Sequence, residues 1–135
     1  GPGRSAFEGL LKGTIKMVDK PGQVFSRVHV DDIAGAVLFL INLYAQGKNP
    51  SVVNVADNLP TNNLEVISFA AKIAKKSLPA KIPFEIAKKT MSPMALSFWQ
   101  ENRKVDNNLL CKKLGYSLIY PNFKSGLKNC FSKLK

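Results

Sequence analysis

The sequence predicts a mixed α/β fold, and two features of its pattern support this class. In the first half, short β-branched segments occur singly, and each is followed by a segment with helical spacing. In the second half, the apolar residues recur almost entirely at helical spacing. We therefore expect strands and helices over residues 1–76 and a smaller, mainly helical part over residues 77–135.

The element boundaries follow from caps, turns and glycine stops. Gly13, Gly47 and Gly115 each follow a helical pattern and are suited to end it. The expected elements are a helix over 5–12, strands over 16–18 and 24–30, a helix over 31–46, a strand over 51–56, a helix over 62–76, a helix over 84–100 with a break at 92–93, and helices over 106–114 and 122–134.

The segment from 31 to 46 is apolar nearly all round, which is typical of a helix buried on most sides. Asp31 or Asp32 is expected to cap its first turn, because a carboxylate accepts hydrogen bonds from the free amide groups there. The apolar run within it, from Ile33 to Ala45, is too short to span a bilayer. We expect no membrane association.

The positive charge lies entirely in the second half. The chain of 135 residues has 20 Lys and Arg against nine Asp and Glu, a formal charge of +11. Residues 1–67 are balanced, so residues 68–135 carry the whole excess. A basic module for nucleic acid or another anionic partner is therefore one alternative. Nucleic acid is the weaker reading, because 17 of the 20 cations are Lys, whereas Arg dominates specific phosphate and base contacts.

Few residues are suited to catalysis or to metal binding. His29 is the single histidine, and it fits best as a hydrogen-bonded group at a strand-to-helix junction. Cys111 and Cys130 are too few for a disulfide framework and have no zinc-ligand spacing with His29. Two unpaired cysteines suit the reducing cytoplasm, where each is expected to be a small apolar group.

The first six residues, GPGRSA, match the G-x-G-x-x-A pattern of dinucleotide-binding turns. That pattern requires a preceding strand and amides that contact phosphate, whereas Pro2 has no amide hydrogen. We therefore expect no self-contained dinucleotide site. The three arginines, Arg4, Arg27 and Arg103, lie at the edges of expected elements, where a guanidinium can bind phosphate with two hydrogen bonds.

Four segments occur in a familiar order: GPGRSAFEGLLKG, FSRVHVDDIAGAV, VVNVADNLPT and LGYSLIYPNFKSGL. Together they resemble the C-terminal half of the NAD(P)-dependent epimerase/dehydratases, which are extended short-chain dehydrogenase/reductases, and in particular small atypical members of that family. The resemblance implies that residues 1–76 are the late strands and helices of a Rossmann-type sheet. It implies a mainly helical substrate lobe over residues 77–135.

The resemblance also implies roles for named residues. Pro2 and Gly3 would border the nicotinamide cofactor, NAD or NADP. The substrate, such as a nucleotide-sugar, would contact four residues: Arg4, Ser26, Arg27 and Arg103. The family's glycine-rich cofactor turn and catalytic Tyr-x-x-x-Lys pair are expected upstream of Gly1.

The chain alone is therefore expected to have no catalytic residue and no bound cofactor. Tyr44 and Lys48 match the Tyr-x-x-x-Lys spacing, but Gly47 would break the helix face that such a pair shares. The expected partners are the missing N-terminal half and a small-molecule substrate. A homodimer is a further alternative.

Overall fold

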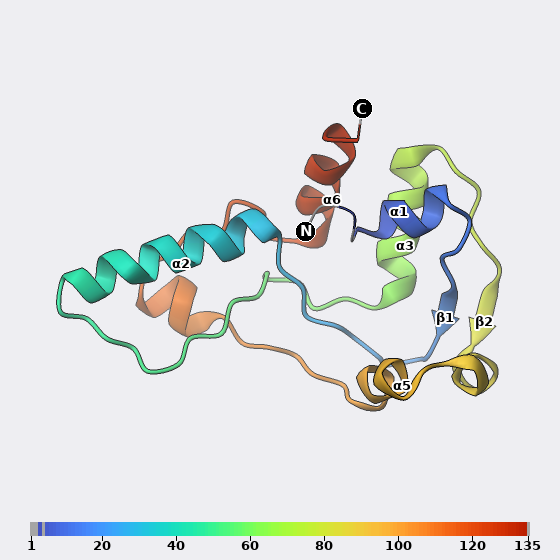
Figure 1. Cartoon of the computed structure of the whole chain (residues 1–135), viewed down its shortest axis with the longest axis horizontal. Coiled ribbons are helices and arrows are strands. Elements are labelled where there is room, and N and C mark those ends of the chain that lie inside the picture. The colour runs from blue at the N-terminus through green and yellow to red at the C-terminus, as the bar shows by residue number, and fades with distance from the viewer. Residues whose placement is uncertain (1–2, 4, 135) are drawn as a thin grey trace.

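A computed structural model describes residues 3 and 5–134 and shows a mixed α/β fold. The first half contains α1 (Ala6–Leu11), β1 (Met17–Asp19), α2 (Val30–Ala45) and α3 (Asn63–Ala74). The second half contains β2 (Lys81–Pro83), α4 (Phe84–Ala87), η1 (Lys88–Thr90), α5 (Pro93–Gln100), η2 (Leu109–Lys113) and α6 (Phe123–Ser132). Figure 1 shows how these helices and strands are arranged in space.

The two strands form one small parallel sheet in which Met17 pairs with Lys81 and Val18 with Ile82. The expected strand over 16–18 is confirmed, and its partner comes from the Pro-punctuated linker between α3 and α4. The structure does not confirm the expected strands over 24–30 and 51–56. Phe25 makes only an isolated antiparallel bridge with Thr61, and residues 51–56 have no strand assignment.

The buried core lies where α1, α3 and α6 meet. Phe7 of α1 is fully buried, and its ring centroid lies 5.2 Å from that of Phe131 on α6. At the start of α6, the Phe123 ring meets the Phe69 ring of α3 edge-on at 5.7 Å. The buried members of this cluster are Phe7, Leu10, Val66, Ala70, Ala71, Phe123 and Leu127.

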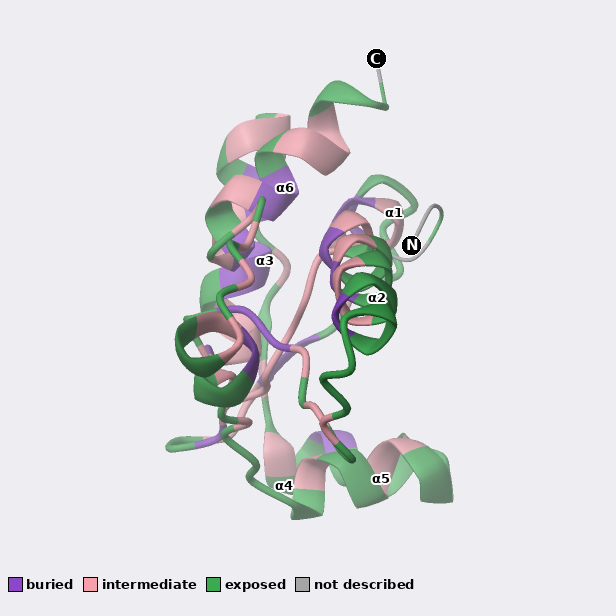
Figure 2. Cartoon of the chain, turned by 90° about the vertical axis from the view of Figure 1, so that its left-hand side faces the viewer, coloured by how far each residue is buried: buried purple, intermediate pink, exposed green. Residues whose placement is uncertain are grey.

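The helix α2 extends away from this core (Figure 1) and is mostly exposed (Figure 2). Leu38 is 61% exposed and Ile41 is 58% exposed, so the expectation that this helix is buried on most sides is wrong for the chain as it stands. Only three of its residues are buried, namely Asp32, Ala36 and Leu43. The helix is apolar on faces for which the described residues provide no packing partner.

The regular elements after β2 are all short helical segments. Ser92 caps α5 by accepting a hydrogen bond from the amide of Ala95, and Pro93 occupies the first turn, which explains the predicted break. The segment expected as a helix over 106–114 is a π-helical turn, η2, in which the amide of Leu114 donates to the carbonyl of Leu109. Gly115 follows with φ near +91°, a value that favours glycine.

No helix in the described part of the chain is long and apolar enough to cross a membrane.

Candidate functional site

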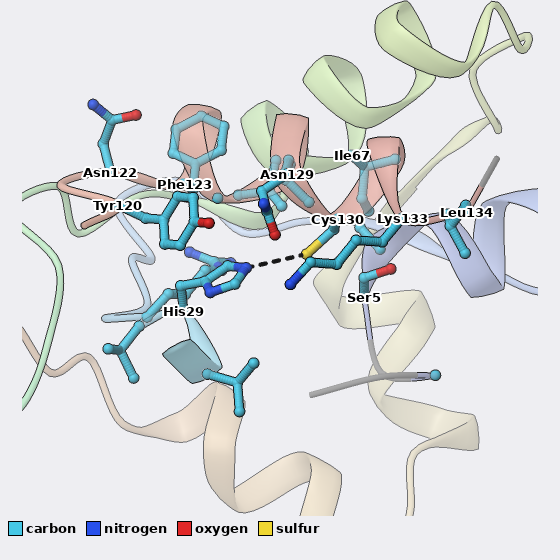
Figure 3. Close-up of a pocket in the computed structure, with 18 of the residues that line it drawn as sticks. Ser5, His29, Ile67, Tyr120, Asn122, Phe123, Asn129, Cys130, Lys133 and Leu134 are labelled. Carbon is cyan, nitrogen blue, oxygen red and sulfur yellow. Dashed lines mark hydrogen bonds between the residues drawn. The ribbon is translucent and has the colours of Figure 1, made fainter. Parts of the chain in front are cut away.

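A cavity of about 670 Å³ lies between α6, the start of α1, one face of α3 and the segment that enters α2. Apolar side chains from α3 and α6, including Ile67 and Phe123, form much of its lining. Polar groups line the rest: Ser5, Arg27, His29, Asn63, Asn122, Asn129 and Lys133. An apolar cavity with a few converging polar groups is typical of a small-molecule site. Figure 3 shows the arrangement.

The structure brings together two of the six predicted site residues. Gly3 and Arg27 both line the cavity. Gly3 has φ near +73°, a left-handed conformation that suits a glycine loop. Pro2 and Arg4 lie outside the described residues, so their predicted roles have no structural counterpart here.

The Arg27 guanidinium is held by the backbone of two segments. Nη1 donates to the carbonyls of Phe25 (3.0 Å) and Thr61 (2.7 Å), and Nη2 donates to Oδ1 of Asn63 at 3.4 Å. These bonds use three of its five N–H donors. Burial lowers the pKa of Arg27 from its ordinary value, and nearby Asp57 partly opposes that effect. The Arg27 guanidinium is therefore fixed in position and partly shielded from water at the cavity wall.

Ser26 and Arg103 lie together, but away from this cavity. Ser26 Oγ accepts a hydrogen bond from the amide of Val105 at 2.8 Å and lies 3.4 Å from the carbonyl of Arg103. The Arg103 side chain is 75% exposed and pairs with Glu101 at 2.7 Å. Ser26 therefore holds the extended link after α5, whereas the guanidinium of Arg103 faces solvent.

The helix α2 begins one residue earlier than expected, and His29 caps it. His29 Nδ1 accepts the amide hydrogen of Asp31 at 3.1 Å. The prediction that Asp31 or Asp32 provides the cap is wrong, because both lie within the first turn, two and three residues after the cap residue His29. The junction role expected for His29 agrees with this geometry, since its side chain is 7% exposed and its ring lies 4.0 Å from that of Tyr120.

Asp32 is completely buried and joins α2 to the segment before α6. Its carboxylate accepts from the hydroxyl of Tyr116 (3.1 Å) and from the amides of Ile119 (2.7 Å) and Tyr120 (2.9 Å). Burial raises the pKa of Tyr116, and the hydrogen bond to Asp32 raises it further, because the charged phenolate would face a carboxylate. This network fixes Tyr120 beside the His29 ring.

Asp57 is a second buried carboxyl near the cavity wall. Its Oδ1 accepts from the amide of Leu59 at 2.9 Å, and its own amide donates to the carbonyl of Arg27 at 2.7 Å. Burial raises the pKa of Asp57, while the Leu59 bond and the Arg27 charge act in the opposite direction. The negative charge of Asp57 therefore favours the charged form of Arg27.

Sequence reasoning missed the contribution of α6 to the cavity. Asn129, Cys130 and Lys133 all line it, and Cys130 Sγ lies 3.6 Å from His29 Nε2. The sequence places Cys130 on the apolar stripe of the last helix, which hides its proximity to a residue about 100 positions earlier. Gly126 provides the only available hint, because it permits close approach: a Cβ there would lie 3.3 Å from His29 Cδ2. None of the described residues form a group of three or more potential metal ligands.

Comparison with known proteins identifies a similar solved structure. No family model matches the chain, and no curated protein matches it. The chain is similar to a solved structure from Silicibacter pomeroyi DSS, described as a functionally unknown conserved protein, with 38% sequence identity and a TM-score of 0.83. The match covers all of this chain but 45% of the other, so this chain spans less than half the length of that protein.

Proposed function

We propose that this chain is the C-terminal half of an NAD(P)-dependent epimerase/dehydratase-like oxidoreductase and contributes its substrate-binding elements. The parent protein would transfer a hydride between nicotinamide and a substrate carbon that bears a hydroxyl or carbonyl group. The cofactor turn and the catalytic Tyr–Lys pair would lie in the preceding half.

The observation that carries the proposal is the exposed apolar face of α2. Leu38 and Ile41 of this 16-residue helix are about 60% exposed, whereas large apolar side chains normally leave water on folding, so this face is suited to contact another part of a larger protein. Residues 51–56 are rich in β-branched side chains yet have no strand partner among the described residues. Both features fit a chain that completes a larger sheet, and a solved structure of more than twice its length contains the same fold.

The described residues fit only the edge of a nicotinamide cofactor site. Gly3 provides the positive-φ loop at the cavity, but no glycine-rich turn joins a strand to a helix in the described part of the chain. The cofactor, when bound to the parent, would supply the hydride. This chain would supply Arg27 as a cation for an anionic substrate group and the apolar wall formed by α3 and α6.

The test compares the chain with a longer protein that includes its natural upstream sequence. NADH and NADPH are titrated into each while nicotinamide fluorescence is measured. The longer protein is expected to bind one of them in the micromolar range, whereas the chain alone should show no saturable binding. The proposal is wrong if the longer protein binds neither.

A second arm tests the role of Arg27 in the same longer protein, with UDP-glucose as a sugar-nucleotide probe. Arg27→Lys keeps a charge but loses the fork of donors, so it should weaken probe binding roughly tenfold. Arg103→Lys is the matched control and should leave binding unchanged, because Arg103 faces solvent. Equal effects of the two substitutions would remove Arg27 from the substrate site without affecting the cofactor result.

A further inference from the structure

The thiol of Cys130 and the imidazole of His29 lie close together in the cavity, and the proposed oxidoreductase function uses neither of them. Cys130 Sγ and His29 Nε2 are 3.6 Å apart, and both residues line the cavity (Figure 3). The sulfur is therefore within reach of a small molecule that enters this space.

The hydrogen bonds of His29 determine what the ring does for the sulfur. Nδ1 accepts the amide hydrogen of Asp31, so it must carry a lone pair. In the neutral ring the proton then lies on Nε2, which faces Cys130. His29 consequently donates a hydrogen bond to the sulfur and does not act as its base. A donor of this kind stabilises a thiolate more than a thiol.

Two further groups from α6 converge on the same place. Lys133 lies one helical turn after Cys130 and lines the cavity, where its ammonium lies 3.4 Å from Asp31 Oδ2. Asn129 Oδ1 is buried and has no hydrogen-bond partner among the described residues. In Figure 3 this oxygen points toward the His29 ring and the Cys130 sulfur. An unpartnered acceptor beside the sulfur suits an O–H donor formed there.

The second cysteine of the chain provides an internal comparison. Cys111 lies in η2 and is not part of the cavity lining. Burial raises the pKa of Cys111, and the negative charge of Asp32 raises it further. Cys111 is therefore expected to be the less reactive of the two thiols.

We propose that Cys130 is a peroxide-reactive thiol, oxidised to a sulfenic acid that the cavity shelters. The Cys130 thiol first releases its proton to solvent. The thiolate sulfur attacks one oxygen of hydrogen peroxide, so that an S–O bond forms while the O–O bond breaks. The leaving hydroxide takes a proton from solvent and becomes water. The sulfur loses two electrons and the peroxide gains them, and the new O–H group can donate to Asn129 Oδ1.

The experiment treats the chain with hydrogen peroxide in the presence of dimedone, which traps sulfenic acids, and measures labelling by mass spectrometry after trypsin digestion. Trypsin places the two cysteines in different peptides, NCFSK for Cys130 and VDNNLLCK for Cys111. Cys130 is expected to be labelled roughly tenfold faster than Cys111. Equal rates, or faster labelling of Cys111, would overturn the proposal.

His29→Asn isolates the contribution of the imidazole. Asn is a strong helix cap, so it can still accept from the Asp31 amide, but its side chain is too short to reach the sulfur. The variant should lower the labelling rate of Cys130 roughly fivefold while that of Cys111 stays unchanged, which also reports that the fold is intact. Lys133→Gln, at an exposed side chain, should produce a smaller decrease. If both variants label Cys130 at the original rate, the surrounding residues do not activate it and the proposal is wrong.

This proposal is independent of the oxidoreductase function. It requires neither the upstream sequence nor a nicotinamide cofactor. Cofactor binding by the longer protein and dimedone labelling of the chain can therefore succeed or fail separately.

Discussion

At the scale of single residues, Asp32 connects the start of α2 with the chain between η2 and α6. Its buried carboxylate accepts hydrogen bonds from one hydroxyl and two backbone amides that lie more than 80 positions later. Hydrogen bonds to a buried charged group contribute more than neutral ones, and their donors become unsatisfied when the acceptor is lost. Asp32 therefore stabilises a contact between two segments that are far apart in the sequence.

Replacement of Asp32 should be costly. Asp32→Asn keeps the shape but turns an NH₂ group toward a backbone amide, so we expect a loss of about 2–4 kcal/mol in the free energy of unfolding, measured by urea denaturation. Asp106→Asn is the matched control. Asp106 is exposed and accepts from the amide of Asn108, a role that Asn can also fill, so its effect should stay within about 0.5 kcal/mol. Similar losses in both variants would contradict the role of Asp32.

At the scale of elements, α2 is a well-formed helix whose outer apolar side chains are not covered by the described residues. His29 caps it, and Gly47 follows it with φ near +79°. Gly35 allows the Tyr116 hydroxyl to approach the helix, where a Cβ would clash with that oxygen. These local features define the helix, whereas its outer apolar residues pack against nothing that the structure describes.

Two leucines of α2, one buried and one exposed, test whether only one face of this helix is packed. Leu43 is 7% exposed and Leu38 is 61% exposed. In the chain alone, Leu43→Ala should lower the free energy of unfolding by about 2–3 kcal/mol. Leu38→Gln should change it by less than about 0.5 kcal/mol. Both are measured by urea unfolding followed by circular dichroism.

The proposed function predicts that the same substitution behaves differently in the longer protein. If the added sequence of the longer protein covers α2, Leu38→Gln there should lower the free energy of unfolding by about 1–2 kcal/mol, because a buried Leu is replaced by a polar side chain. An equally small effect in both proteins would show that another surface, or none, covers this helix.

At the scale of the whole molecule, contacts join the parts before and after residue 76. The strand β1 pairs with β2 across this position, and α3 packs against α6. Trp99 of α5 lies between two rings, with its centroid 5.1 Å from that of Phe25 and 5.9 Å from that of Phe84. Lys20 also donates to the Trp99 carbonyl.

These contacts predict cooperative unfolding of residues 1–76 with residues 77–135. Trp99 is the single tryptophan, so its fluorescence reports the contact between the two parts. Urea transitions followed by Trp99 fluorescence and by far-ultraviolet circular dichroism should have the same midpoint. Midpoints that differ by more than about 0.5 M would indicate that residues 77–135 unfold as a separate unit.

The sequence by itself determined where most helices lie, because many caps and glycine stops are local, although it assigned the cap of α2 to the wrong residue. Asn62 before α3 and Ser92 before α5 act through hydrogen bonds within three residues of themselves. The mixed α/β class and the helical second half also follow from local periodicity. The segment over 51–56 shows the limit of this reasoning, since a strand needs a partner that its own residues cannot specify.

Only the tertiary structure decided which residues form the cavity and which face of α2 is buried. Arg27 and Gly3 both line the cavity, and Cys130, Asn129 and Lys133 reach it through the packing of α6 against α3. Ser26 and Arg103 lie elsewhere, because Ser26 binds the extended link after α5 and Arg103 pairs with Glu101 at the surface. Burial depends on what a side chain meets in space, so an apolar helix pattern indicates a need for a partner and does not identify that partner.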